Sequence, residues 1–355
     1  MEVRKEIGKI IRRVVFMIKF DDEYYKETIK KYHYNAMDFK PIDFNLKSIS
    51  KDVMKEKWLC HYKAEKFVDG IKDDKKQIIT TGIGLSGTPH MGTLSQILRA
   101  IFLQQSGFDV QFVLGDLDSY NARNQSLEVL AERVEKYSGF IKRLGFDEHK
   151  GVLRNQIDHP EILKTAYLIS NCLTDEDFLA AEEDLSELYK SKKIYNGIDF
   201  KVKQAILLMV ADFISLGTIN NYDNILVMLG LEEHLYVQIA QKVVDRMNYD
   251  FSIGALYSRI IKGLNGYPKM SKSIPDSSIT VDMSPERIED LVVNSKDEYL
   301  IPEDSTIFQM MNAVSYYTVD ELKELREICL KGGVEWQDKK KQYAKTLTKI
   351  CKEWK

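Results

Sequence analysis

Cysteines are scarce in this sequence, and their positions follow no functional spacing. The chain of 355 residues has four, Cys60, Cys172, Cys329 and Cys351, which form neither a metal-binding spacing nor a disulfide framework. We therefore expect reduced thiols, as in a cytoplasmic protein. The sequence also lacks an apolar run long enough to span a bilayer, and its basic N-terminus has no small-residue cleavage site typical of a signal peptide.

An excess of charge of either sign is also missing. The 51 lysines and arginines nearly balance the 54 aspartates and glutamates, which leaves a net charge of −3. This balance excludes a uniformly basic nucleic-acid coat protein, so any RNA contact must come from local patches. With 44% hydrophobic and 30% charged residues the composition is typical of a globular protein. The length favours one large domain with an appendage, or two domains.

A loop rich in lysine and serine, Pro268-Lys-Met-Ser-Lys-Ser273, stands out among the residues that are present. Its lysines, Lys269 and Lys272, are three residues apart, so in a loop both ammonium groups can converge on one anion. Serine hydroxyls and backbone N–H groups can complete an oxyanion cradle. This arrangement suits a triphosphate whose charge is held while a phosphorus atom is attacked. The alternative is a solvated loop, which most strings of this kind are.

A strand, a glycine-rich turn and a helix follow one another near the first third of the chain. The sequence predicts a buried strand at 77–81, a turn at 82–87 and a helix from about His90 to Ser106. Such a unit opens many nucleotide-binding α/β folds. Its glycines let the backbone approach a nucleotide, and the N-terminus of its helix favours anions.

A second strand is predicted at 110–114, and two acids, Asp116 and Asp118, follow it directly. Ligands of open α/β sheets bind at the carboxyl ends of strands, so these acids are candidates for substrate contact. Helix-capping or loop acids are the equal alternative. Further strands are predicted near 152–153 and 224–229, and further helices at about 127–144, 160–195, 203–216, 234–247 and 254–261.

The helix predicted at 203–216 is apolar except for Asp212 near its centre. A carboxylate inside an apolar helix costs several kcal/mol unless it has a partner. Asp212 is therefore a candidate site residue. A capped or salt-bridged acid at the margin of the helix is the alternative.

The sequence predicts helices at both ends of the chain. Residues 1–75 place Ile7, Ile11, Val14 and Ile18 at helical spacing and predict helices with irregular links, either as a structural extension or as a tRNA contact. From Pro285 onward the pattern is helical, and the last helix, about 336–355, carries seven lysines beside an apolar stripe. This basic helix either contacts RNA phosphates or is a solvated surface helix. The expected domains are thus 1–75, 76–284 and 285–355.

Two short motifs together point to a family. Pro89-His-Met-Gly-Thr93 and Lys269-Met-Ser-Lys-Ser273 resemble the two signatures of class I aminoacyl-tRNA synthetases in their order and separation. From about residue 76 the chain resembles the tryptophanyl/tyrosyl branch, and the continuation to Ile279 is similar to the tryptophanyl form. The resemblance implies a Rossmann-like parallel sheet with helices on both faces, a helical C-terminal domain and a helical N-terminal extension. It also implies ATP and Mg²⁺, an amino acid and tRNA as partners, and a homodimer.

The resemblance assigns roles to individual residues. The catalytic group would be Lys269, Lys272, His90 and Thr93, and ATP would be bound by Gly82, Gly84, Ser86, Gly92, Met270, Ser271 and Ser273. Residues 205–214 resemble the specificity helix of bacterial tryptophanyl enzymes, in which Asp212 would accept the indole N–H and Met209 would pack on the ring. Glu233 and Gln238 would complete the amino-acid pocket, and no protein side chain is expected to ligate a metal.

The sequence departs from the family pattern at several positions. Thr93 replaces the second histidine of the first signature, and Leu231-Glu232-Glu233 stands where the family usually has Asp-Gln after a glycine. Gly84 and Leu85 also replace residues usual near the first turn. Two alternatives to a tryptophan–tRNA ligase therefore remain open. One is a paralogue that adenylates another amino acid, such as tyrosine, or a small carboxylate without tRNA charging; the other is a non-catalytic regulator that binds tRNA or an amino acid.

Overall fold

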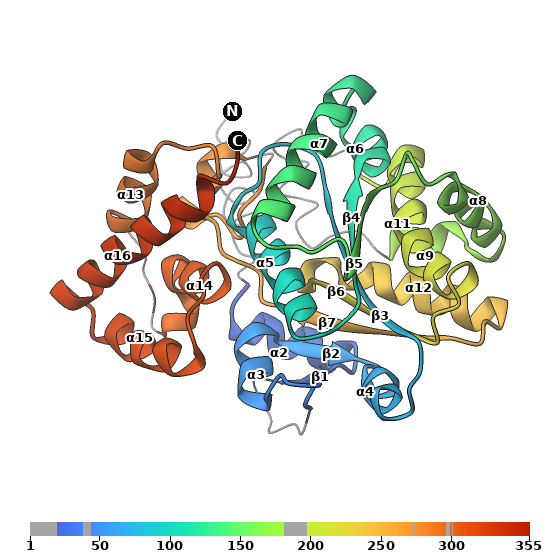
Figure 1. The fold of residues 1–355 in the computed structure, drawn as a ribbon, viewed down its shortest axis with the longest axis horizontal. Helices are drawn as coiled ribbons and strands as arrows, with labels where there is room; N and C mark the ends of the chain where they lie inside the picture. The colour runs from blue at the N-terminus through green and yellow to red at the C-terminus, as the bar shows by residue number, and fades with distance from the viewer. Residues whose placement is uncertain (1–19, 38–43, 181–196, 273, 296–298, 300) are drawn as a thin grey trace, which may run out of the picture.

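A computed structural model of the chain describes residues 20–37, 44–180, 197–272, 274–295, 299 and 301–355. One seven-stranded sheet forms its centre, in the order β1-β2-β7-β6-β3-β4-β5 (Figure 1). The strands are β1 (Asn35–Ala36), β2 (Cys60–Tyr62), β3 (Gln77–Gly84), β4 (Val110–Gly115), β5 (Gly151–Asn155), β6 (Asn224–Gly230) and β7 (Ser252–Ser258). The expected Rossmann-like α/β fold is confirmed.

The five strands from β7 to β5 run parallel. β3 is the first of them in the chain; β4 and β5 follow on one side of it, and β6 and β7 on the other. The direction of winding therefore reverses between β3 and β6. In open α/β sheets the ligand crevice lies at such a switch point, beyond the carboxyl ends of the strands.

Alternate side chains of the sheet belong to two different cores. In β6, Leu226 and Met228 pack in one hydrophobic cluster, while Ile225 and Val227 pack in the other. The first cluster includes side chains of α5 (Met91–Gln105) and α7 (Leu127–Arg143), and the second those of α11 (Phe200–Thr218) and α12 (His234–Met247). Helices thus cover both faces of the sheet, and every residue of the central strand β6 is buried.

The N-terminal part contains the helices α2 (Asp22–Lys31), α3 (Lys51–Lys57) and α4 (Glu65–Lys72), as expected. It also contains β1 and β2, which the sequence did not predict. β2 pairs antiparallel with β7 and so extends the main sheet. The strands β1 and β2 are only two and three residues long, too short to show the alternation of apolar and polar residues that signals a strand. The strand that holds β2 in the sheet, β7, is also distant in the chain. The helical pattern at Ile7–Ile18 lies outside the described residues.

The helix predicted at 254–261 is wrong, because these residues belong largely to the strand β7. Six of its seven residues are buried, with alternate side chains in the two cores. A continuous apolar run buried on both faces has no periodicity that separates strand from helix. The acidic helical segment expected at 160–195 begins as α8 (Pro160–Ile169), a 3₁₀ turn at Ser170–Cys172 and α9 (Asp175–Leu179). Residues 181–196 lie outside the described part.

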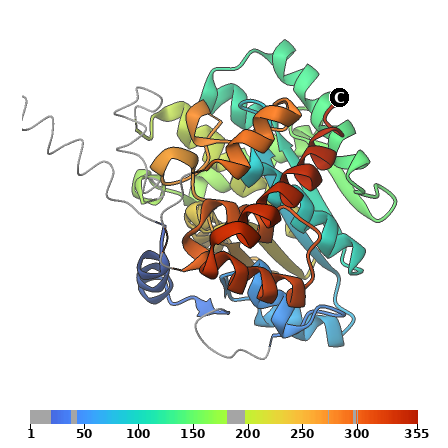
Figure 2. The same ribbon diagram turned by 90° about the vertical axis from the view of Figure 1, so that its left-hand side faces the viewer.

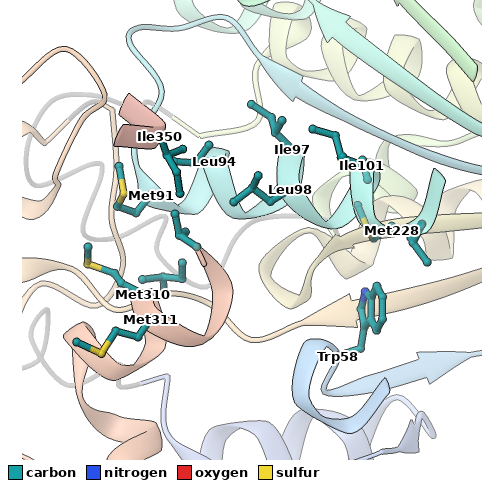
Figure 3. Close-up of a cluster of buried hydrophobic side chains, with 14 of the residues drawn as sticks. Trp58, Met91, Leu94, Ile97, Leu98, Ile101, Met228, Met310, Met311 and Ile350 are labelled. Carbon is teal, nitrogen blue, oxygen red and sulfur yellow. The ribbon is translucent and has the colours of Figure 1, made fainter. Parts of the chain in front are cut away.

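The C-terminal helices α13 (Pro285–Val293), α14 (Thr306–Ala313), α15 (Val319–Lys331) and α16 (Gly333–Cys351) form a separate layer (Figure 2). The helix α5 joins this layer to the sheet: Met91 and Leu94 lie near Met310 and Ile350, and the far end of α5 lies near Met228 (Figure 3). None of the described helices is both long and apolar enough to cross a membrane.

The lysines of the last helix do not all lie on a solvated face. Lys340 is only 4% exposed, and its Nζ donates to the carbonyl of Val293 at the end of α13, 2.7 Å away. Lys341, Lys345 and Lys349 are exposed. The uniform basic face expected from the sequence is therefore interrupted by one lysine that joins two helices.

Candidate active site

The first turn, the lysine loop and the end of β6 surround one cavity at the switch point. Its volume is about 260 Å³. The residues predicted for ATP binding and catalysis meet here, although they lie almost 200 positions apart in the chain. The lining includes Gly82, Gly84, Ser86, His90, Gly92, Thr93, Glu233, Lys269, Met270, Ser271 and Lys272.

His90 caps the N-terminus of α5 with its side chain. Its Nδ1 accepts from the backbone N–H of Thr93 at 3.3 Å. Burial, together with Lys272 and Lys269, holds the pKa of His90 well below its usual value, so the ring is neutral at pH 7. Because Nδ1 accepts a hydrogen bond, the proton of the neutral ring sits on Nε2, which is then a donor. Gly92 is required beside this ring, since a Cβ there would lie 2.8 Å from His90 Cε1.

Backbone hydrogen bonds connect the two motifs. The N–H of Val281 donates to the carbonyl of Pro89 at 3.0 Å, and the N–H of Met91 donates to the carbonyl of Ile279 at 3.2 Å. The chain that leaves the lysine loop is therefore paired with the entrance of α5. Inside the loop, the N–H of Ser271 donates to Ser277 Oγ at 3.0 Å and Ser278 Oγ at 2.9 Å, which fixes its curvature.

Lys272 reaches across to the first turn. Its Nζ donates to the carbonyl of Gly84 at 2.6 Å and lies 5.6 Å from the centroid of the Tyr137 ring. Burial, Arg123 and Arg133 lower the pKa of Lys272 to about 7, while Glu233 acts in the opposite direction. The protonated amine of Lys272 is therefore costly in this position. A bound polyanion would stabilise the ammonium group and raise its pKa toward the usual value.

Lys269 lies on the other side of the cavity, with its Nζ 3.8 Å from Glu232 Oε1. The second oxygen of this carboxylate, Oε2, is buried and has no hydrogen-bond partner among the described residues. Gly230 allows this position, because a Cβ there would lie 2.2 Å from Glu232 Oε2. Glu232 thus places a negative charge beside one of the two loop lysines.

A smaller cavity of about 50 Å³ adjoins the first one and shares Gly82, Gly84 and Glu233 with it. The two residues predicted to select the amino-acid side chain, Met209 and Asp212 of α11, both line it. The structure therefore places the predicted specificity helix next to the predicted ATP cavity. The volume suffices for a few water molecules, at about 10–15 Å³ each.

Both oxygens of Asp212 are already engaged. Arg154 Nη2 donates to Oδ1 at 2.6 Å, and Gln156 Nε2 donates to Oδ2 at 2.7 Å. Arg154 is 8% and Asp212 2% exposed, so this is a buried ion pair. Burial raises the pKa of Asp212 and the Arg154 guanidinium opposes this shift. The salt-bridged acid considered from the sequence is thus what the structure shows, although it lies deep in the helix packing.

The two acids after β4 have different surroundings. Asp116 accepts from the backbone N–H of Gln156 at 2.9 Å and so holds the end of β5. Asp118 lines both cavities, and its Oδ1 is buried without a hydrogen-bond partner among the described residues. Burial, followed by the neighbouring Asp212, raises the pKa of Asp118 well above its usual range. Asp118 is the acid that faces the two cavities, and Asp116 is a structural one.

Gln238 is not brought to the site. Its Nε2 donates to the hydroxyl of Tyr34 at 3.0 Å, and it is missing from the described residues that line either cavity. Ser273 lies outside the described residues. Within the described part of the chain, no group of three or more His, Cys, Asp and Glu side chains is placed to hold a metal ion.

Sequence reasoning missed Arg154 and Gln156, which bind Asp212, and gave Glu232 no role in the ATP cavity. Arg154 lies near the end of β5 and Gln156 directly follows this strand, which is the outermost parallel strand on the β4 side of the sheet. Polar residues after an apolar strand were the only available signal, the same signal that singled out Asp116 and Asp118.

A doubly wound sheet with two lysines and a histidine-capped helix at its switch point defines a nucleotide-binding α/β protein. Residues 72–352 match the family model "tRNA synthetases class I (W and Y)", and the chain belongs to this family. It is 22% identical to the tryptophan–tRNA ligase of Methanopyrus kandleri, over 82% of this chain and 80% of that one. It is 26% identical to the tyrosine–tRNA ligase of the same organism, over 61% and 64%. The crystal structure of tryptophanyl-tRNA synthetase from Aeropyrum pernix shares its fold, with a TM-score of 0.76 at 19% identity over 94% and 92%.

Proposed function

We propose that this protein activates an amino acid with ATP and transfers it to tRNA, and that tryptophan is the amino acid. One observation carries the chemistry: Lys269, Lys272 and His90 line one cavity at the switch point of the sheet. Family membership supports an aminoacyl-tRNA ligase. The relatives include both tryptophan and tyrosine enzymes, so the choice of amino acid is the finer part of the proposal.

In the first step a carboxylate oxygen of the amino acid attacks the α-phosphorus of ATP. A P–O bond forms to the amino acid, the bond between the α-phosphorus and the bridging oxygen breaks, and pyrophosphate leaves with that electron pair. In the second step a hydroxyl of the terminal adenosine of tRNA attacks the acyl carbon, loses its proton, and AMP leaves. Mg²⁺ is part of the substrate, bound to the phosphate oxygens of ATP. The protein supplies position and charge.

The residues of the cavity divide these tasks. Lys269 and Lys272 hold the β- and γ-phosphates as charge develops on pyrophosphate, and Ser271 and Ser273 add donors. His90, neutral and protonated on Nε2, donates to a phosphate oxygen, and Thr93 lies in the first turn of the same helix. Gly82, Gly84 and Gly92 let the nucleotide lie against the backbone, with Ser86 and Met270 beside it. Each of these roles is assigned from position in the cavity, except that of Ser273, which rests on the resemblance of the loop to the second family signature.

For the amino acid, the proposal places the side chain beside α11. Asp212 would accept the indole N–H and Met209 would pack on the ring, since a buried acceptor discriminates strongly for a ligand that carries the matching donor. In the structure each oxygen of Asp212 already accepts one hydrogen bond, from Arg154 and Gln156, so the indole N–H would use a remaining lone pair or displace one of these donors. Glu233 and Asp118, which line both cavities, face the α-ammonium group in this arrangement.

The two acids that border the smaller cavity, Asp212 and Asp118, favour a second candidate, activation of a smaller and polar carboxylate. A polar side chain with several donors can satisfy Asp212 and Asp118 together, whereas an indole ring has a single N–H. A small polar side chain needs no movement of the buried ion pair. This candidate keeps the same adenylating chemistry and changes only the acid that is activated.

The test is amino-acid-dependent exchange of pyrophosphate into ATP across the standard amino acids, followed by charging of tRNA. Exchange with tryptophan alone supports the proposal. Exchange with a small polar amino acid supports the second candidate. No exchange with any amino acid, with or without tRNA present, contradicts a synthetase and leaves a regulator or a ligase for another carboxylate.

Transfer to tRNA requires a surface for RNA, and the exposed lysines of α16 are our candidate. We expect the double change Lys345→Glu and Lys349→Glu to weaken tRNA binding and make it less sensitive to salt, because fewer counterions are released. The exchange reaction should be unchanged. The matched control is Lys323→Glu with Lys331→Glu on α15. Equal effects of both pairs on the affinity for tRNA, measured from 50 to 200 mM salt, would contradict a specific role of α16.

The low pKa of Lys272 predicts how ATP affinity depends on pH. In the protein alone this amine loses its proton above about pH 7, and bound phosphates raise its pKa again. The complex therefore binds more protons than the protein alone above pH 7, and ATP affinity should fall as pH rises from 7 to 9. Calorimetry in buffers of different ionisation enthalpy should show proton uptake. The variant Lys272→Met should lose both effects, and retention of either would assign them to another group.

A homodimer is the last part of the proposal. Apolar side chains are exposed on α8 and at the start of α11, two helices that pack against each other on the side of the molecule away from the C-terminal layer (Figure 1); among them Tyr167 is 80% and Phe200 76% exposed. We expect Tyr167→Glu with Phe200→Glu to convert a dimer into a monomer in light scattering, since exposed apolar groups of this size mark interfaces. Tyr316→Glu, at a position 69% exposed in another region, is the control. A wild-type monomer would contradict the proposal.

A further inference from the structure

A third cavity lies beside the candidate active site and has no role in the proposed reaction. Its volume is about 350 Å³, and it is bordered by α3, α5, α14 and the segment 259–261 that follows β7. Ile260 and Ile261 line both this cavity and the candidate ATP cavity. The segment after β7 is therefore a shared wall between the two.

All three acids that line this cavity form ion pairs. Asp22 Oδ1 lies 3.0 Å from Arg259 Nη1, and Glu56 Oε2 lies 3.0 Å from Arg326 Nη2. The third lining acid, Glu303, also pairs with Arg326. Three acids thus face two arginines. The other cations of the lining are Lys55, Lys57 and Arg99.

Arg99, on α5, is the most deeply placed of them, with only 7% of the residue exposed. Its Nη1 donates to Ser95 Oγ at 3.1 Å. In the part of the chain that the structure describes, no carboxylate lies within 4.0 Å of the guanidinium. Burial lowers the pKa of Arg99 to about 10, and the field of Glu232 compensates only part of this cost. A buried guanidinium with one neutral hydrogen bond is poorly satisfied.

Lys57 adds a second cation to the same wall. Its Nζ lies 4.6 Å from the centroid of the Phe102 ring. Phe102 follows Arg99 by about one turn of α5. Burial, followed by the charge of Arg99, lowers the pKa of Lys57 to about 8, with Glu56 acting in the opposite direction. The two cations therefore repel each other in a site that water reaches poorly. An anion between them would remove this penalty.

Trp58 provides an independent observation. The residue follows α3, lines the cavity and is 1% exposed. Its indole N–H is buried and has no acceptor among the described residues. Figure 3 shows Trp58 beside α5, with the nitrogen on the side of the ring toward that helix. A buried donor without an acceptor destabilises the folded protein, and a ligand oxygen placed at this nitrogen would remove that cost.

We propose that this cavity binds a small phosphate-bearing molecule, with its phosphate held by Arg99, Lys57 and the indole N–H of Trp58. Two cations and a neutral N–H match a dianion with several acceptor oxygens better than a single carboxylate. Ile260 and Phe308 in the lining provide apolar surface for the body of the ligand. The site is separate from the lysine loop, and the proposal does not depend on the amino acid that is activated.

The test uses the three tryptophans, Trp58, Trp336 and Trp354, as reporters in ¹⁵N-indole NMR of the full chain. Trp58→Phe assigns the resonance. Inorganic phosphate, phenyl phosphate and acetate are titrated separately at constant ionic strength. We expect the Trp58 indole proton to move downfield saturably with both phosphates and not with acetate, and Lys272→Met to leave this titration unchanged. Tighter binding of phenyl phosphate supports use of the apolar wall. Equal shifts with acetate, or no saturable shift of Trp58, would overturn the proposal.

The variant Arg99→Gln with Lys57→Gln separates a binding role from a structural one. We expect it to weaken phosphate binding at least tenfold at Trp58, and to keep or raise the melting temperature in phosphate-free buffer, because two poorly satisfied cations are removed. The wild-type protein, in contrast, should gain thermal stability as phosphate is added. Unchanged phosphate affinity in this variant overturns the proposal, as does a large fall in melting temperature together with an unmoved Trp58 resonance in the wild-type titration.

Discussion

Replacement of Lys272 by methionine should lower the rate of adenylate formation by about 10²–10³-fold, the usual effect of removing one donor that stabilises developing charge. The side chain reaches the first turn across the cavity, and its Nζ is 2.6 Å from the carbonyl of Gly84. Methionine keeps the length and apolar stem of lysine and removes only the ammonium group. The measurement is pyrophosphate exchange at saturating ATP and amino acid.

The binding of the amino acid separates this role from a general loss of structure. Its dissociation constant, measured without ATP, should change less than about twofold, because Lys272 acts on charge that develops in the transition state. Lys323→Met on α15, where the lysine is paired only with an exposed acid, is the matched control and should have full activity. Equal losses in amino-acid binding and exchange would show that Lys272 is not a transition-state residue.

Asp212→Asn should reduce the free energy of unfolding by about 3–5 kcal/mol, because it leaves Arg154 as an uncompensated buried charge. Arg154→Met leaves Asp212 as the unpaired buried charge, but this carboxylate can then take up a proton and become neutral. Since burial raises the pKa of this carboxyl, the Arg154→Met variant should be more stable at pH 5 than at pH 8 relative to wild type. Urea unfolding at several pH values measures both effects.

The double variant Arg154→Met with Asp212→Leu should recover most of the lost stability, since a buried ion pair is often replaceable by apolar residues of similar volume. Arg287→Ala is the matched control: its partner Asp290 is about half exposed, and such surface pairs contribute about 1 kcal/mol or less. Costs of the same size at Arg287 and Arg154 would contradict a special role for the buried pair. The double variant also tests specificity, because it removes the carboxylate of Asp212 from the lining of the side-chain cavity.

The elements that the sequence predicted well have local signals. Glycines separate β3 from α5, and α5 begins after His90, whose side chain caps the helix. β7 was predicted as a helix because its apolar run is buried on both faces, and β1 and β2 were missed because they are short and depend on pairing with a distant strand. Local patterns encode periodicity and helix caps. They do not encode the tertiary partner that decides whether an apolar segment becomes a strand or a helix.

The site shows the same division between local and long-range information. The lysine loop and the histidine turn were recognisable as separate motifs, and the structure places them around one cavity. The sequence also singled out Asp212 as a buried acid in need of a partner. It could not name Arg154, since the two residues are 58 positions apart and only the sheet order brings β5 next to α11. Gln238 was chosen by resemblance, and its partner Tyr34 belongs to a segment without any motif.

The pairing of residues 89–91 with 279–281 has a consequence for synthesis on the ribosome. The first signature is translated early, yet its hydrogen-bond partners are the residues that follow the second signature. β3 likewise waits for β6, which emerges much later, to cover its second edge. During translation the nascent chain therefore carries an uncovered strand edge and an unfinished nucleotide site, the kind of species that chaperones protect. The cavity at the switch point is thus complete only after residues 279–281 have left the exit tunnel, and a product truncated before them would lack the partners of the first signature.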